Sequence, residues 1–122
     1  VRIVWRNYPL SFHQNAGPAA EAAMAAHEQG KFWEMHDKMF ANQQALDRAS
    51  LEKYAAEIGL DMNRFKAALD SNRYQNQVKQ DMAQAEGVGI SGTPSFVING
   101  KLLVGAQPFE KFKEMIDAEL AK

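Results

Sequence analysis

The sequence predicts an α/β fold in which most of the chain is helical and the strands lie near its two ends. Val1 to Trp5 is rich in β-branched and apolar residues, which is typical of a mostly buried strand. Between residues 18 and 87, apolar side chains recur at helical spacing and glycines separate the runs. From residue 88 onward, a short β-branched run and an Asn-Gly pair predict a hairpin before a final helix.

The bulk composition is that of one globular domain. The chain has 122 residues, of which 46% are hydrophobic and 24% charged. Lys and Arg number 14 and Asp and Glu 15, so the net charge of −1 provides no electrostatic basis for binding nucleic acid or an anionic membrane. No apolar run approaches the roughly 18 residues that a membrane helix needs. We therefore expect no nucleic-acid partner and no membrane insertion.

The chain contains no cysteine. This excludes disulfides, thiolate metal sites and cysteine nucleophiles within these residues. The sequence shows no signal peptide, and Val1 already falls inside the predicted strand. We therefore expect that a preceding part of the protein is missing from this chain.

The first two predicted helices follow from glycine, proline and apolar spacing. Pro18 fits the first position of a helix, where a missing N–H costs nothing. Residues 19–29 favour a helix, and Gly30 is expected to end it in the left-handed conformation. A second helix is expected over about residues 31–41. Its apolar face consists of Phe32, Met35 and Met39.

Two aspartates mark the starts of the next helices. Asp47 is a predicted N-cap for a helix that Gly59 ends, and Asp61 is the predicted N-cap of its successor. Leu60 and Phe65 occupy the two positions of a hydrophobic staple around Asp61. A further helix is expected to run to Gly87, with a buried face of Tyr74, Val78, Met82 and Ala85.

The segment from residue 91 to residue 100 carries the most specific local pattern. A loop ends in Thr93-Pro94, a short strand follows over residues 96–98, and Asn99-Gly100 supplies the two positive-φ positions of a type I′ hairpin turn. The return strand covers residues 101–104. The last helix is expected to begin at Pro108 and to bury Phe109, Phe112, Ile116 and Leu120.

This order of elements, with Gly-Thr-Pro-Ser-Phe-Val-Ile-Asn-Gly at residues 92–100, resembles the bacterial DsbA-like thiol:disulfide oxidoreductases. These proteins have a thioredoxin fold with an inserted helical subdomain. The resemblance covers nearly the whole chain and implies a single, incomplete thioredoxin-like domain over residues 1–122. The helical insertion would comprise residues 18–87, and the hairpin and closing helix residues 88–122. The family's Cys-x-x-Cys motif, with its central strand and helix, would lie upstream of Val1.

The resemblance implies a substrate-binding role for Thr93 and Pro94 and no catalytic residue in this chain. In the family the Thr-Pro bond is cis and faces the redox cysteines, and the backbone of the threonine pairs with an extended substrate peptide. The implied partners are extended or unfolded proteins in an extracytoplasmic compartment, periplasmic or secreted, and no cofactor is implied. The chain alone is expected to be inactive. Read locally, Pro94 could instead begin an edge strand in the trans form.

A missing central strand has a physical consequence, because it leaves two strand edges without partners. The two remaining strands could pair directly, or a separate amino-terminal fragment could complete the sheet. Two copies could also fill each other's gaps. We expect the last outcome, a homo-oligomer or swapped dimer.

Other interpretations of the chain remain open at this stage. A cysteine-less thioredoxin-like domain could bind extended peptides as an adaptor, and a glutathione-dependent enzyme of the same fold would need a glutathione site that this chain lacks. The histidines at positions 13, 27 and 36 are 14 and nine residues apart, which matches no compact metal site, so no metal is expected. Ser11 with His13 has no surrounding hydrolase motif. The six methionines are interpreted as core filling. Tyr8, Phe12 and Trp33 could border a hydrophobic substrate groove.

Overall fold

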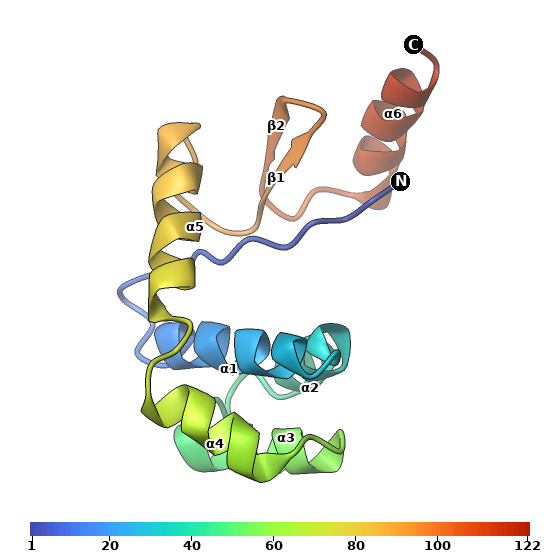
Figure 1. Ribbon diagram of the computed structural model, residues 1–122. Helices are drawn as coiled ribbons and strands as arrows, with labels where there is room; N and C mark the ends of the chain where they lie inside the picture. The colour runs from blue at the N-terminus through green and yellow to red at the C-terminus, as the bar shows by residue number, and fades with distance from the viewer. The chain divides into compact units, whose positions relative to one another are not determined.

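The computed structural model describes all residues from 1 to 122 and contains six helices and one two-stranded sheet (Figure 1). The chain forms two compact units, residues 1–84 and residues 85–122, and each is described here by itself. The elements are α1 (Ala16–Glu28), α2 (Phe32–Ala41), α3 (Arg48–Glu57), α4 (Met62–Asp70), α5 (Gln75–Gly87), β1 (Ser95–Ile98), β2 (Lys101–Val104) and α6 (Phe109–Leu120). No helix is both long and apolar enough to span a membrane.

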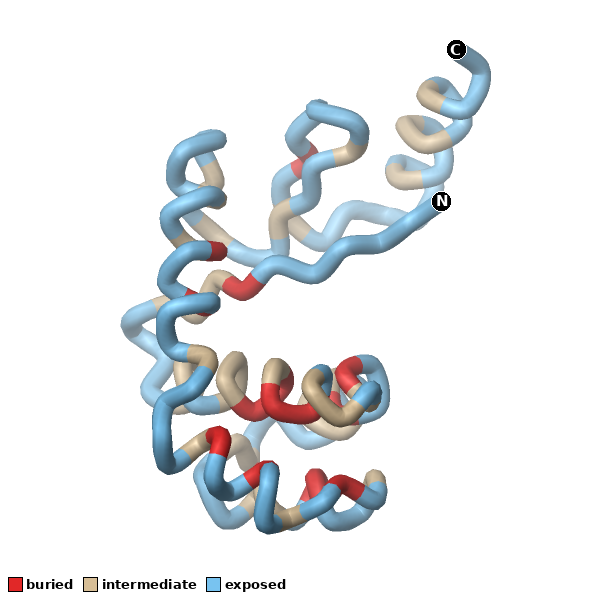
Figure 2. The backbone as a smooth tube through the Cα atoms, in the orientation of Figure 1, coloured by how far each residue is buried: buried red, intermediate tan, exposed pale blue.

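The core of the first unit lies where α1, α2, α3 and α4 meet. The alanine-rich face of α1 has no bulky side chains, which allows its neighbours to approach closely, and its buried residues are Ala22, Ala23, Ala25 and Ala26. Met35, Leu51 and Phe65 are the largest fully buried side chains. In Figure 2 most of the buried positions of this unit lie on these four helices, and a smaller group lies on α5 and on the extended stretch before α1. Met39 and Met62 pack against the same core, so for Met35 and these two the interpretation as core filling is confirmed.

The glycines that follow α1 and α3 end these helices as predicted. Gly30 has a φ of 76° and Gly59 a φ of 83°, the left-handed region that favours glycine. The prediction that α5 runs to Gly87 is confirmed. Gly87 is the last helical residue, and Gly89, with a φ of 89°, takes the left-handed conformation.

The two predicted aspartate caps are at the expected positions but bond differently. Asp61 accepts a hydrogen bond from the main-chain N–H of Arg64 at 3.2 Å. Leu60 and Phe65 are both buried, as the staple predicts. The side chain of Asp47 caps no main-chain N–H of α3 and instead accepts a hydrogen bond from the Ser50 hydroxyl at 2.6 Å.

Both predicted proline positions are shifted. α1 begins at Ala16, so Pro18 is its third residue rather than its first. The position remains compatible with proline, because none of the first four N–H groups of a helix has an intrahelical partner. Pro108 occupies the N-cap position before α6, with φ −58° and ψ 149°. Its extended ψ places it just outside the helix.

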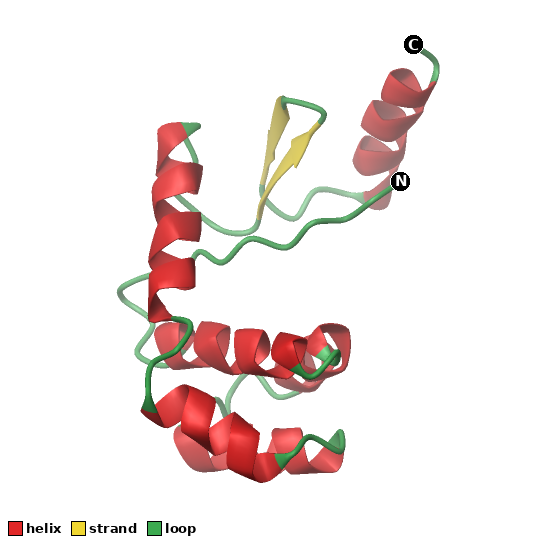
Figure 3. Ribbon diagram, viewed as in Figure 1, coloured by secondary structure: helices red, strands yellow, loops and turns green.

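The prediction of a strand over Val1 to Trp5 was wrong. The segment is extended but pairs with no other strand, and Figure 3 draws it as loop. Val1 is 91% exposed and Ile3 76% exposed. The physical reason is that a strand is defined by a neighbour that bonds its main-chain groups, and the sheet contains β1 and β2 alone.

The second unit consists of the end of α5, the hairpin and α6. β1 pairs antiparallel with β2, with Ser95 opposite Val104 and Ile98 opposite Lys101. Between the strands, Asn99 has a φ of 47° and Gly100 a φ of 86°, as a type I′ turn requires. The hairpin prediction is therefore confirmed in both position and turn type.

The prediction of a buried apolar face on α6 was wrong. Phe109 is 73% exposed and Leu120 69% exposed, and no residue of α6 is fully buried. Phe112 packs edge-on against Phe96 with ring centroids 4.7 Å apart, and Ile116 is half-buried. Within this unit the four-residue strands are too small to cover a helix of 12 residues.

Candidate functional site

Two hydrogen bonds fix the Thr93-Pro94 loop that precedes β1. The hydroxyl of Ser95 donates to the carbonyl of Gly92 at 2.7 Å, which closes the turn around Thr93. The N–H of Gly105 donates to the carbonyl of Pro94 at 2.8 Å and so extends the hairpin pairing by one residue pair. The loop is therefore attached to the hairpin.

Thr93 and Pro94 are both exposed, and the peptide bond between them is cis. The main-chain groups of Thr93 make no hydrogen bond. Because the carbonyl of Pro94 points toward β2, alternation along an antiparallel strand turns the main-chain groups of Ser95 and Val97 toward the opposite edge. That edge of β1 has no partner in the sheet. The loop and this edge form a continuous exposed row of hydrogen-bonding groups.

This arrangement can bind an extended polypeptide but cannot perform thiol chemistry. An incoming strand would find free N–H and C=O groups along β1, which is the basis of recognition by strand addition. Thiol–disulfide exchange needs a thiolate that attacks a sulfur atom, and the chain has no cysteine. Within this chain the loop and the edge of β1 therefore supply hydrogen-bonding groups but no sulfur nucleophile.

The three histidines and the aromatic residues Tyr8, Phe12 and Trp33 that the sequence singled out all belong to the first unit. Phe12 stacks on the neighbouring His13 with centroids 4.5 Å apart, and His36 lies 3.0 Å from the carboxylate of Asp37. No three His, Asp or Glu residues come together as a metal-binding group. Tyr8 is half-buried.

Trp33 belongs to a cluster of aromatic rings that the sequence did not predict. Trp5 lies over α2, with its ring centroid 5.3 Å from Phe32, 6.4 Å from Trp33 and 5.3 Å from His36. We call these four residues the aromatic cluster. Trp33 is 45% exposed, so the cluster reaches the surface of the first unit.

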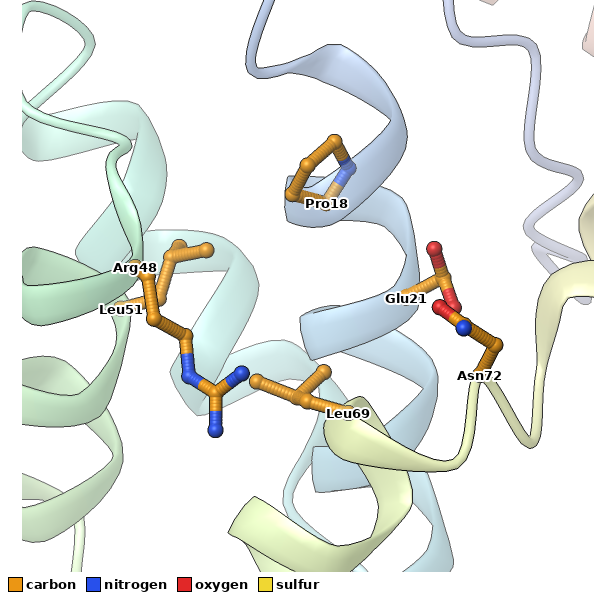
Figure 4. A pocket seen from close by; sticks show the side chains of 6 residues that line it. All are labelled: Pro18, Glu21, Arg48, Leu51, Leu69 and Asn72. Atoms are coloured by element: carbon orange, nitrogen blue, oxygen red, sulfur yellow. The ribbon is translucent and has the colours of Figure 1, made fainter.

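A small depression of about 230 Å³ lies in the first unit among α1, α3 and the end of α4. Figure 4 shows its lining residues, which are Pro18, Glu21, Arg48, Leu51, Leu69 and Asn72. Burial raises the pKa of Glu21, and its Oε1 atom has no hydrogen-bond partner. Arg48 is already paired with Glu52 at 2.8 Å and Asp70 at 2.9 Å. The depression therefore offers no free cationic group.

The element order and the hairpin geometry define a thioredoxin-like α/β domain with inserted helices. Residues 2–117 match the family model described as the DSBA-like thioredoxin domain. The chain belongs to this family.

Two solved structures show the same fold over almost all of this chain. The thioredoxin-like oxidoreductase of Silicibacter pomeroyi DSS-3 superposes with a TM-score of 0.86 and 27% identity, covering 98% of this chain and 68% of that protein. The thiol-disulfide exchange protein alpha-DsbA2 of Wolbachia pipientis superposes with a TM-score of 0.85 and 19% identity, covering 95% of this chain and 64% of that protein. The second likeness concerns the fold alone.

One relative with a matching sequence is named as a transport protein and not as an oxidoreductase. The Na(+)/H(+) antiporter NhaA 3 of Salinispora tropica is 47% identical to this chain over 102 residues. The matched region is 83% of this chain and 16% of the antiporter. The chain therefore spans less than a fifth of the length of this relative.

Proposed function

We propose that this chain is a portion of a DsbA-like thiol:disulfide oxidoreductase that contains the substrate-binding Thr-Pro loop but not the redox cysteines. It would bind extended or unfolded polypeptides at Thr93 and Pro94. The observation that carries the proposal is the exposed, unbonded main chain of Thr93, which continues into the free edge of β1. Membership of the DSBA-like thioredoxin domain family supports it. The same membership supports an extracytoplasmic location.

The redox chemistry is assigned to cysteines outside these 122 residues, because the chain has none. In such a reaction a substrate thiolate attacks an enzyme disulfide, forms a mixed disulfide and releases one enzyme thiolate. A second substrate thiolate then displaces the other enzyme thiolate, so the substrate gains a disulfide and the enzyme is reduced. The role of Thr93 would be to hold the substrate extended during both steps.

The binding step can be tested by the same substitution on opposite edges of the hairpin. Val97 and Leu102 are directly opposite each other, and the main-chain N–H of each points away from the hairpin. Val97→Pro removes an N–H from the edge that continues from Thr93, whereas Leu102→Pro removes one from the other edge. An unfolded polypeptide with its cysteines replaced by serine serves as the probe.

We expect Val97→Pro to weaken binding of this probe at least tenfold and Leu102→Pro to leave it nearly unchanged. Amide hydrogen exchange should slow at Thr93 and Ser95 when the probe binds. Equal losses in both variants, or binding without protection of Thr93, would overturn the proposal. The purified chain should show no insulin reduction, and activity in that assay would contradict the assignment of the redox chemistry to outside residues.

Two further candidate functions have specific support. The 47% identity to part of a Na(+)/H(+) antiporter favours a DsbA-like domain carried by a longer transport protein. An antiporter encoded in the same reading frame would support it.

The absence of cysteine favours a peptide-binding adaptor without redox activity. A Cys-x-x-Cys motif elsewhere in the same protein would exclude the adaptor and favour the oxidoreductase.

A further inference from the structure

The depression in the first unit combines an apolar surface with one unpaired acidic group. Its apolar lining residues are Pro18, Leu51 and Leu69, and its polar lining residues are Glu21, Arg48 and Asn72. In Figure 4 the carboxyl group of Glu21 and the side-chain amide of Asn72 point toward one another. A ligand in the depression would therefore meet both apolar contacts and hydrogen-bonding groups, as in most small-molecule sites.

The positive charge at the depression is already neutralised. Arg48 lies 2.8 Å from the carboxylate of Glu52 and 2.9 Å from that of Asp70, and the ammonium of Lys66 lies 3.5 Å from Glu52. These two cations and two carboxylates balance each other. An anionic ligand would have to displace one of these ion pairs, so the depression does not favour an anion.

Glu21 is the charge that remains without a partner. It makes no ion pair, and its Oε1 atom is shielded from solvent and accepts no hydrogen bond. Burial raises the pKa of Glu21, and no neighbouring cation counteracts this effect. A cationic ligand would supply the missing opposite charge and stabilise the ionised carboxylate.

The end of α4 fixes the backbone at Asn72, the second acceptor of the depression. Asn72 has a φ of 51° and takes the left-handed position that often follows a helix. Its N–H donates to the carbonyl of Leu69 at 3.2 Å, and the N–H of Arg73 donates to the carbonyl of Ala68 at 3.1 Å. Because the main chain is held in this way, less entropy is lost when a ligand bonds the Asn72 side chain.

The size and the acceptors of the depression define the ligand. A volume of about 230 Å³ is the space of about seven water molecules, which admits a short alkyl stem with one polar head group. A guanidinium prefers to bond both oxygens of a carboxylate, and the shielded Oε1 of Glu21 disfavours that geometry. An ammonium is compact and needs only one carboxylate oxygen. Another of its three N–H groups can donate to the side-chain carbonyl of Asn72.

We propose that the depression is a binding site for a primary ammonium group on a short alkyl stem, the chemistry that free alkylamines and lysine side chains share. The ammonium donates to Glu21 and Asn72, and the stem packs against Leu51 and Leu69. This site lies in the first unit and depends neither on Thr93 nor on redox chemistry.

Titration of the 122-residue chain with butylammonium chloride tests the proposal. 1-Butanol serves as a neutral ligand of the same size, and potassium chloride holds the ionic strength constant. Amide NMR shifts at Glu21, Leu69 and Asn72 give the affinity and the location. We expect saturable binding in roughly the millimolar range, at least about tenfold tighter for butylammonium than for 1-butanol, because hydrogen bonds between charged groups are the stronger ones. Equal affinities, or shifts that do not saturate at these residues, would overturn the proposal.

Glu21→Gln and Glu34→Gln form a matched pair of variants, because each removes one negative charge from a helix of the first unit. Glu21→Gln should lose the preference for butylammonium over 1-butanol, and Glu34→Gln, at an exposed position, should keep it. Equal losses in both variants would mean that butylammonium responds to the net charge of the chain and not to this site.

N-acetyl-lysine N-methylamide distinguishes the two sources of the ammonium group. An affinity similar to that of butylammonium would assign the site to lysine side chains of polypeptides, and an affinity at least about tenfold lower would assign it to free amines. Both results support the shared chemistry only if Glu21→Gln abolishes the binding. Unchanged binding of both probes by Glu21→Gln would overturn it.

Discussion

Asn7 and Asp81 are 74 positions apart in the sequence and are joined by two hydrogen bonds to the same carboxylate oxygen. Both residues are almost fully buried, at 3% and 5% exposure. The other oxygen of Asp81 accepts from the Gln77 side chain at 2.9 Å. The carboxylate thus connects Asn7, the residue that follows the extended stretch 1–6, to α5 within the first unit.

Replacing Asp81 with alanine should lower the free energy of unfolding by about 1–3 kcal/mol, because it leaves the buried donors of Asn7 without an acceptor. Gln77→Ala is the matched control on the same helix, since it removes a donor to Asp81 but leaves both Asn7 bonds in place. Urea unfolding followed by tryptophan fluorescence measures both. A loss in Asp81→Ala no larger than that in Gln77→Ala would show that the Asn7 bonds contribute little.

Glu21 makes the stability of the first unit dependent on pH. Burial raises the pKa of Glu21 in the folded state, which means that folding disfavours the charged carboxylate. The contribution of Glu21 to the free energy of unfolding is therefore most favourable below its ordinary pKa of 4.5, and it is lost as pH rises through the raised pKa of the folded state. Glu21→Gln should therefore be more stable than the natural chain at pH 7, by on the order of 1 kcal/mol or less. This advantage should shrink at pH 4. Urea midpoints at the two pH values measure it.

The exposed Glu34 on α2 supplies the control for that measurement. Glu34→Gln removes a carboxylate from an exposed position in the first turn of α2. It should not stabilise the unit, and it should lower stability by up to about 1 kcal/mol through the lost interaction with the helix dipole. A stabilisation by Glu21→Gln that is equal at pH 4 and pH 7 would contradict the burial of the Glu21 carboxylate as its cause.

The same substitution at two phenylalanines should separate the core from the surface. Phe65 is fully buried among α1, α3 and α4, whereas Phe109 at the start of α6 is 73% exposed. Phe65→Leu should cost about 1–2 kcal/mol through the cavity and lost contacts, and Phe109→Leu less than about 0.5 kcal/mol. Thermal or urea unfolding compares them. Equal costs would mean that Phe109 is covered in solution.

Features that depend on a few neighbouring residues could be predicted from the sequence. The cap at Asp61, the left-handed Gly30 and Gly59, and the Asn99-Gly100 turn each follow from local backbone rules. The fold class needed the order of all the elements together with the family resemblance. Thr93 as a candidate site rested on that resemblance, because its loop has no distinctive local chemistry.

Features that depend on distant partners could not be predicted in this way. Residues 1–5 have the composition of a strand, but a strand also needs a neighbour, and the sheet supplies none. The apolar spacing on α6 is helical, yet it does not specify what covers Phe109. The burial of Asp81 does not follow from the apolar spacing of α5, because such spacing marks buried positions only where they are apolar. A single aspartate beside Val78 and Met82 is explained by Asn7, which lies near the other end of the chain.

Two glycine-to-alanine substitutions should change stability in opposite directions for a purely backbone reason. At neither Gly17 nor Gly100 would an added Cβ meet another atom within 4 Å. Gly17 lies in the first turn of α1, where alanine should stabilise the first unit by up to about 0.5–1 kcal/mol, through the lower entropy of its unfolded chain. Gly100 has a φ of 86°, so alanine there should destabilise the hairpin by about 1–2 kcal/mol. Urea unfolding measures the first effect and amide exchange in β1 and β2 the second. A Gly17→Ala variant less stable than the natural chain would contradict the first expectation. Unchanged exchange in Gly100→Ala would contradict the turn geometry that sets the pairing of Ile98 with Lys101.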